Sequence, residues 1–114
     1  MPDPVVYFEI VGGDAETQQS FYADLFGWQL APVDSTGGSY ARTQAGIEGG
    51  VGAFPGAPNY VTVYVQAKEP AAALARAVEL GGTTLMEPRE VREGITVAMF
   101  RDPAGNAVGL ISGV

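Results

Sequence analysis

The feature that most constrains this chain is an internal repeat of one strand, one helix and three strands. The first copy is predicted from a strand-type run over Val5–Val11 and a helix over Ala15–Phe26, which Asp14 can cap and Gly27 can end. Its other strands are expected at Trp28–Leu30, Tyr40–Thr43 and Gly50–Phe54. The second copy is expected as a strand over Tyr60–Gln66, a helix over Pro70–Leu80, and strands over Thr83–Met86, Ile95–Arg101 and Ala107–Ser112.

A small sheet with one helix can cover only one of its two faces, so each module needs a partner for the other face. We therefore predict a single α+β domain over residues 1–114, with module one at about 4–54 and module two at about 59–112. The two βαβββ modules would pair into an open, barrel-like trough with the helices outside. Small-molecule sites favour such concave surfaces. The polar stretch Glu87–Glu93 is expected as a solvated loop.

The amino-acid composition excludes several classes of function for this chain. The 114 residues are 46% hydrophobic and 17% charged, as in a globular domain, and the formal net charge is −7. This acidity argues against nucleic acid and anionic lipid as partners. The chain has no cysteine and no histidine, which excludes disulfides, thiolate nucleophiles and histidine bases. With neither a signal-peptide pattern nor an apolar run long enough to span a bilayer, we expect a cytoplasmic protein.

Three short stretches carry a family resemblance: "FYADLFGW" in and after the first helix, "ELGG" at the end of the second, and "DPAGN" before the last strand. In this order and spacing the chain resembles the vicinal oxygen chelate superfamily, which includes glyoxalases, extradiol dioxygenases and bleomycin-resistance proteins. The closest likeness is to small single-domain, glyoxalase-like members. The resemblance covers nearly the whole chain and implies the same paired-module fold.

The resemblance also implies where metal ligands would lie in metal-dependent members. The four positions correspond here to Tyr7, Thr62, the stretch Gly50–Ala53, and Gly109, where a glutamate is usual. None of these residues is a usable ligand, apart from a weak tyrosinate, because transition metals need imidazole, thiolate or carboxylate donors. We therefore predict no metal and no cofactor, so that metal-dependent reactions cannot be inherited from the resemblance.

Strand alternation sorts the remaining side chains. Tyr7 and Glu9 are expected to face the trough with Val5 and Val11, while Val6, Phe8 and Ile10 face a helix. In module two Val61, Val63 and Val65 are expected against a helix, and small inward residues such as Gly109 would leave room where a metal would have been. The predicted ligand-contacting set is Tyr7, Glu9, Trp28, Tyr40, Thr62, Tyr64, Gln66 and Gly109.

Each of these residues also has a purely structural interpretation. Tyr7, Tyr64 and Trp28 can be core aromatics whose polar ends find partners. Glu9 is either satisfied by a backbone amide or an arginine of the other module, or it serves ligand recognition or proton transfer, and the sequence leaves both open.

Three functions follow from this pattern. The first is a metal-free binding protein that holds a small, partly aromatic and cationic molecule, as in antibiotic or metabolite sequestration. The second is a metal-independent isomerase, cyclase or lyase with Glu9 as general base. The third is a domain that has lost its ligand and only dimerises. In every case relatives of this size suggest a homodimer.

Overall fold

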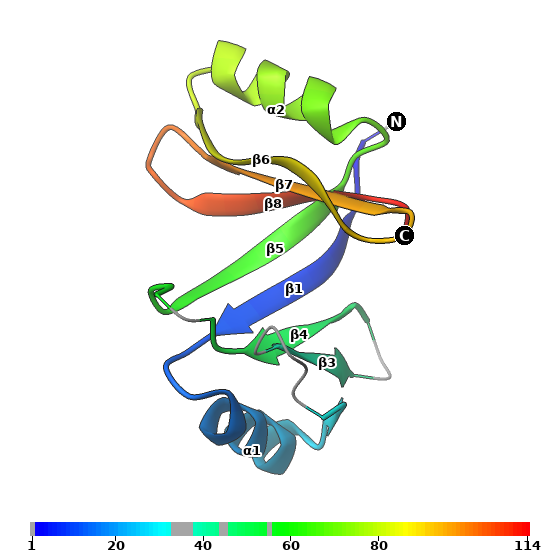
Figure 1. Ribbon diagram of the computed structural model, residues 1–114, viewed down its shortest axis with the longest axis vertical. Coiled ribbons are helices and arrows are strands. Elements are labelled where there is room, and N and C mark those ends of the chain that lie inside the picture. Colours follow the sequence, from blue (N-terminus) through cyan, green and yellow to red (C-terminus); the bar gives the residue numbers. More distant parts are fainter. Residues whose placement is uncertain (1, 33–37, 44–45, 55) are drawn as a thin grey trace. The chain divides into compact units, whose positions relative to one another are not determined.

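The computed structural model describes all residues except 1, 33–37, 44–45 and 55. The element order is β1 (Val5–Val11), α1 (Ala15–Phe26), β2 (Gln29–Leu30), β3 (Gly38–Arg42), β4 (Glu48–Gly52), β5 (Tyr60–Gln66), α2 (Pro70–Glu79), β6 (Thr83–Arg92), β7 (Ile95–Arg101) and β8 (Ala107–Ser112). This order confirms the α+β class and the two βαβββ modules (Figure 1). Residues 33–37, between the second and third strands expected in the first module, lie outside the described residues.

The chain divides into two compact units, and each is described by itself. The N-terminal unit comprises Tyr7–Thr62, and the C-terminal unit comprises Val63–Val114 with the first residues through Val6. Because the trough predicted from the sequence lies between the two modules, it stays a prediction.

In the N-terminal unit the strand order is β2-β3-β4-β1, with β1 parallel to β4 and the other neighbours antiparallel. Helix α1 packs on β2, β3 and β4 (Figure 1). Its start is capped as predicted, because a carboxylate oxygen of Asp14 accepts the backbone N–H of Glu16 at 3.2 Å. Its end is at Gly27, whose φ of 72° is the left-handed conformation that glycine adopts at low cost.

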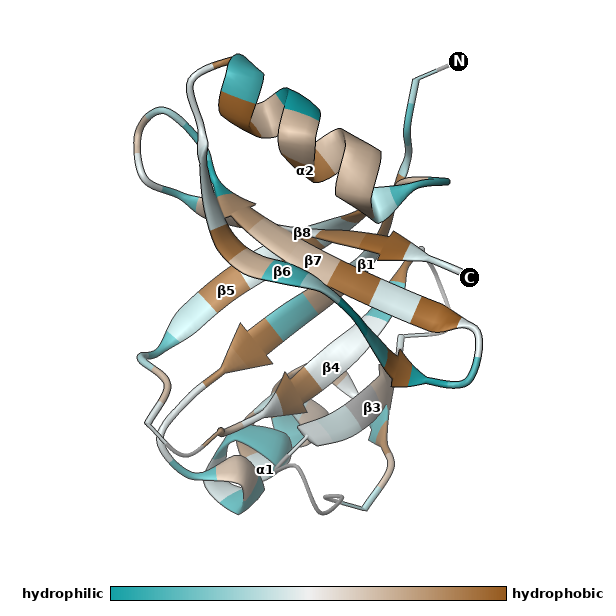
Figure 2. Ribbon diagram, turned by 45° about the horizontal axis from the view of Figure 1, so that its top comes forward, coloured by the Kyte–Doolittle hydropathy of each residue, from teal (hydrophilic) through white to brown (hydrophobic). Residues whose placement is uncertain are grey.

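In the C-terminal unit the strand order is β5-β8-β7-β6, with β5 parallel to β8. Helix α2 packs on β6, β7 and β8, and brown, hydrophobic segments alternate with paler ones along β7 and β8 (Figure 2). The buried core under α2 consists of Ala67, Leu74, Ala98 and Leu110, with Val65, Ala73 and Phe100 packed against it.

Two expectations for the C-terminal half were wrong. Strand β6 continues to Arg92, so Glu87–Arg92 is not a loop; its pairing with β7 is irregular around Pro88, which has no N–H to give. Val61 and Val63 do not lie under a helix, because α2 packs mainly on the other strands; their side chains are 70% and 38% exposed.

A turn over residues 102–106 precedes β8. Asp102 accepts hydrogen bonds from the backbone N–H groups of Ala104 and Asn106, at 3.0 and 2.9 Å, and from the Asn106 side chain at 3.0 Å. These bonds, chiefly the one from the Asn106 side chain, lower the pKa of the Asp102 carboxyl. The Arg101 side chain also donates to the Gly105 carbonyl at 3.0 Å. Neither helix of the described chain is long and apolar enough to cross a membrane.

Candidate functional site

The face of the N-terminal sheet opposite α1 carries Tyr7 and Glu9. Residues paired across neighbouring strands share a face, and Glu9 lies opposite Gly50 in the β1–β4 register. The Tyr7 hydroxyl lies over the same Gly50, since a Cβ placed there would be 3.0 Å from it. Phe8 points the other way, where its ring contacts Trp28 at a centroid distance of 5.2 Å. The predicted alternation along this strand is therefore confirmed for Tyr7, Phe8 and Glu9.

A tyrosine that the sequence analysis did not select is a partner of Glu9. The Tyr60 hydroxyl donates to Oε1 of Glu9 at 2.7 Å, and both side chains are half-buried. For the structural interpretation of Glu9, the sequence suggested a backbone amide or an arginine of the other module. No local pattern could have paired Tyr60 with Glu9, because the two residues are 51 positions apart.

The environment of the pair keeps the phenol protonated. Partial burial, the hydrogen bond to Glu9 and the negative charge of that carboxylate all raise the pKa of Tyr60 above its ordinary value of about 10. Near neutral pH Tyr60 is therefore a neutral donor. It orients one carboxylate oxygen of Glu9 without cancelling the charge.

Trp28 does not lie on the same face as Tyr7 and Glu9. Its ring stacks on Tyr22 of α1, with centroids 5.8 Å apart and an angle of 12° between the planes, and it also contacts Phe26 at 5.1 Å. Together with the Phe8 contact, this places the indole on the helix side of the sheet. The structural interpretation therefore accounts for its position, and Trp28 is removed from the candidate site.

In the C-terminal unit the space over Gly109 is filled. Tyr64 lies opposite Gly109 in the β5–β8 register and is only 7% exposed. A Cβ at Gly109 would come within 2.7 Å of three atoms of the Tyr64 side chain. The expectation that Gly109 leaves an open volume was therefore wrong, because the tyrosine ring of the neighbouring strand occupies it.

The other three residues of the predicted ligand-contacting set lie in different surroundings. Thr62 is buried, with 5% of its surface exposed. The backbone of Tyr40 lies opposite Gly50, but its side chain is outside the described part of the structure. Gln66 turns toward the end of the chain, where its Nε2 donates to the Val114 carbonyl at 2.7 Å.

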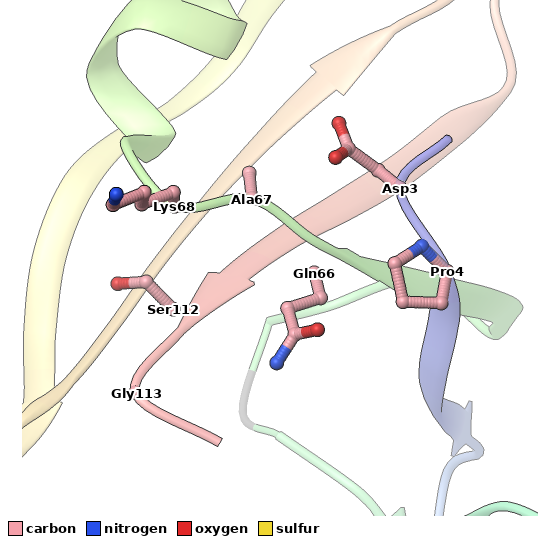
Figure 3. Close-up of a pocket in the computed structure, with 7 residues that line it drawn as sticks. All are labelled: Asp3, Pro4, Gln66, Ala67, Lys68, Ser112 and Gly113. Atoms are coloured by element: carbon pink, nitrogen blue, oxygen red, sulfur yellow. The ribbon is translucent and has the colours of Figure 1, made fainter. Parts of the chain in front are cut away.

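Gln66 also lines a shallow pocket of about 350 Å³ in the C-terminal unit (Figure 3). The pocket is formed by the first residues of the chain, the end of β5 with the residues that follow it, and the end of β8. Its lining residues are Asp3, Pro4, Gln66, Ala67, Lys68, Ser112 and Gly113. Of the predicted ligand-contacting residues it includes Gln66 alone, so it is distinct from the Glu9–Tyr60 face.

The donor set does not fit the metal that the fold family implies. Within the described residues, no group of three histidine, cysteine, aspartate or glutamate side chains is placed to hold an ion. At Gly109, the last position of the family pattern, the Tyr64 ring lies where a ligand side chain would begin, and at Gly50, within the stretch Gly50–Ala53, a Cβ would lie 3.0 Å from the Tyr7 hydroxyl. No metal-dependent step is therefore derived for this chain.

Comparison with known families decides the classification. A model described as a glyoxalase-like domain matches residues 9–111. The chain belongs to this family. This match confirms the glyoxalase-like resemblance. The chain's solved neighbours include a glyoxalase, a dioxygenase and a member of the glyoxalase/bleomycin resistance protein/dioxygenase superfamily, which share its fold. No curated protein matches the sequence.

Similar solved structures lie at low identity. A hypothetical protein from Bacillus halodurans C-125 has a TM-score of 0.72 at 13% identity, over 98% of this chain and 95% of that one. Methylmalonyl-CoA epimerase from Mycobacterium tuberculosis has a TM-score of 0.72 at 12% identity, over 96% and 87%. A Mn(II)-bound glyoxalase from Novosphingobium aromaticivorans has a TM-score of 0.65 at 20% identity, over 98% of this glyoxalase-like domain and 38% of that chain. These likenesses show the fold.

The filled space over Gly109 generates a stability prediction. Gly109→Ala should lower the free energy of unfolding by about 1–3 kcal/mol, because the methyl group overlaps the buried Tyr64 ring. Urea unfolding followed by circular dichroism measures the change. Gly13→Ala is the matched control, since nothing lies within 4 Å of its Cβ position. The loss should shrink in a Tyr64→Ala background; an equal loss there would contradict the steric argument.

Proposed function

We propose that this glyoxalase-like protein is a metal-independent binding protein of the glyoxalase/bleomycin-resistance type, which sequesters a small, partly aromatic and cationic antibiotic or metabolite. The observation that carries the proposal is the hydrogen bond from Tyr60 to Glu9, on the sheet face that also bears Tyr7. Glu9 is the polar anchor for the cation, and Tyr7 offers an aromatic surface beside it.

The charge of the surroundings supports a cationic ligand. The Tyr60 phenol adds no positive charge beside Glu9, and a charge-assisted hydrogen bond is worth more in half-buried surroundings than in water. Between residues 7 and 62 the sequence has six acidic residues and one basic residue, Arg42. An anionic ligand would meet repulsion from this unit.

A second candidate is a metal-independent isomerase, cyclase or lyase with Glu9 as general base. The likeness to methylmalonyl-CoA epimerases favours it, because these neighbours are isomerases by name. Two features rank it second. One oxygen of Glu9 already accepts the hydrogen bond from Tyr60, which leaves the carboxylate fewer acceptor sites for a substrate proton. The acidity of the unit also does not suit the phosphate groups of a CoA ester.

A thermal-shift screen of the purified protein distinguishes the two candidates. Bleomycin and the matched probes phenethylammonium and phenylacetate, which differ mainly in the sign of their charge, are a suitable first panel. A binding protein should gain stability with the cationic members and return them unchanged, whereas an enzyme should return a modified product. Stabilisation by phenylacetate alone would contradict the proposed ligand class.

Glu9→Gln tests the anchor itself. Glutamine keeps the shape and an acceptor for Tyr60 but removes the charge, so the variant should fold at least as well as the parent. Affinity for a cationic ligand from the screen should fall on the order of tenfold to a thousandfold, as loss of a charge-assisted bond implies. Titration calorimetry measures it. A variant that loses stability yet binds normally would assign Glu9 a structural role.

Metal independence is part of the proposal, and the metal content of the purified protein tests it. The protein purified without an affinity tag should hold no stoichiometric transition metal, because the four family positions offer no imidazole, thiolate or carboxylate donor. Elemental analysis by mass spectrometry provides the count. One tightly held zinc, nickel, manganese or iron ion per chain would refute this part of the proposal.

We also propose that the protein is a homodimer, as relatives of this size suggest. Light scattering at micromolar concentration should give twice the chain mass of 11.8 kDa. A monomer mass under these conditions would contradict the assembly without affecting the role of Glu9.

A further inference from the structure

Helix α1 exposes an unusual amount of apolar surface. No residue of this helix is buried, and the side chains of Phe21, Leu25 and Phe26 are 56%, 58% and 56% exposed. By contrast, α2 buries Leu74 almost completely. Isolated exposed apolar residues are ordinary, but three large ones within six residues of one helix form a candidate interaction surface. We call these three side chains the α1 patch.

The α1 patch is supported by packing from within the unit. Phe26 stacks with Tyr22 at 6.2 Å and contacts Trp28 at 5.1 Å, while Phe21 meets Tyr22 edge-on at 5.1 Å. Phe21 and Leu25 are four residues apart and therefore lie on one side of the helix. Because these rings already hold one another, a partner would lose little free energy in ordering them.

The charged residues of α1 are all acidic. Glu16 and Asp24 lie on the same helix with exposed side chains, and Asp14 caps its first turn. The helix has no lysine or arginine, and the whole unit has only Arg42. A second α1 helix would bring the same acidic residues against these, which disfavours pairing of α1 with α1 of a second copy. A basic partner would be complementary.

We propose that the α1 patch docks a basic amphipathic segment of another protein, whose apolar side chains cover Phe21, Leu25 and Phe26 and whose lysines or arginines pair with Glu16 and Asp24. Proteins commonly recognise amphipathic helices in this way, through the apolar face of the helix. The surface lies on the helix side of the sheet, opposite Glu9, so the inference is independent of the proposed ligand.

The single tryptophan gives a direct assay, because Trp28 contacts Phe26. The probe is an amphipathic helical peptide of leucine and lysine, titrated against the full chain while Trp28 emission is followed. A matched peptide with glutamate in place of lysine is the charge control. We expect saturable binding of the lysine peptide that is at least tenfold tighter than that of the glutamate peptide.

Variants locate the surface. Phe21→Ser with Leu25→Ser should weaken binding of the lysine peptide at least tenfold, whereas Leu80→Ser, which removes an equally exposed leucine after α2, should not. Asp24→Lys is a second variant that leaves the apolar residues intact. Asp24→Lys should weaken binding of the lysine peptide and strengthen binding of the glutamate peptide. Both changes should be larger than those caused by the matched charge reversal Glu93→Lys.

Three results would overturn the inference. One is no saturable binding of the lysine peptide. Another is equal weakening by the α1 variants and their controls, which would mean binding by net charge alone. The third is conversion of a dimer into a monomer by the α1 variants in light scattering, which would mean that a second copy of this chain covers the patch.

Discussion

Large side chains that pack against glycines of a neighbouring parallel strand determine which positions of this protein's sheet are filled. Tyr64 covers Gly109, and Phe8 covers Gly49, where an added Cβ would lie within 2.5 Å of the ring. Glycine at these positions lets a large side chain lie against the backbone of the adjacent strand. The turn and last strand of the family pattern are kept, and the position that would bind a metal serves packing instead.

The same arrangement leaves one charged group with a defined partner. Glu9 lies opposite Gly50, so no side chain from β4 stands directly across from it, and Tyr60 orients its carboxylate at 2.7 Å. Recognition of a cation by a neutral-phenol–carboxylate pair needs neither a metal nor a second charge. This chemistry is consistent with a chain that has no histidine or cysteine.

Strand and helix positions were largely predictable, because each depends on residues that are close in sequence. Alternation placed Tyr7 and Glu9 on one face and Phe8 on the other, and the cap at Asp14 began α1 at the expected residue. The extension of β6 from Met86 to Arg92 was missed, because its charged residues are typical of a solvated loop. Val61 was also misplaced, because a strand pattern cannot say which strands a helix covers.

The sequence by itself determined the repeat, the turn at Asp102 and the lack of metal donors, because these depend on composition and short-range order. Only the tertiary structure decided that Tyr60 donates to Glu9, that Trp28 stacks on Tyr22, and that a ring occupies the space over Gly109. These three are contacts between different elements. Their formation depends on strand register and helix packing, which local periodicity does not encode.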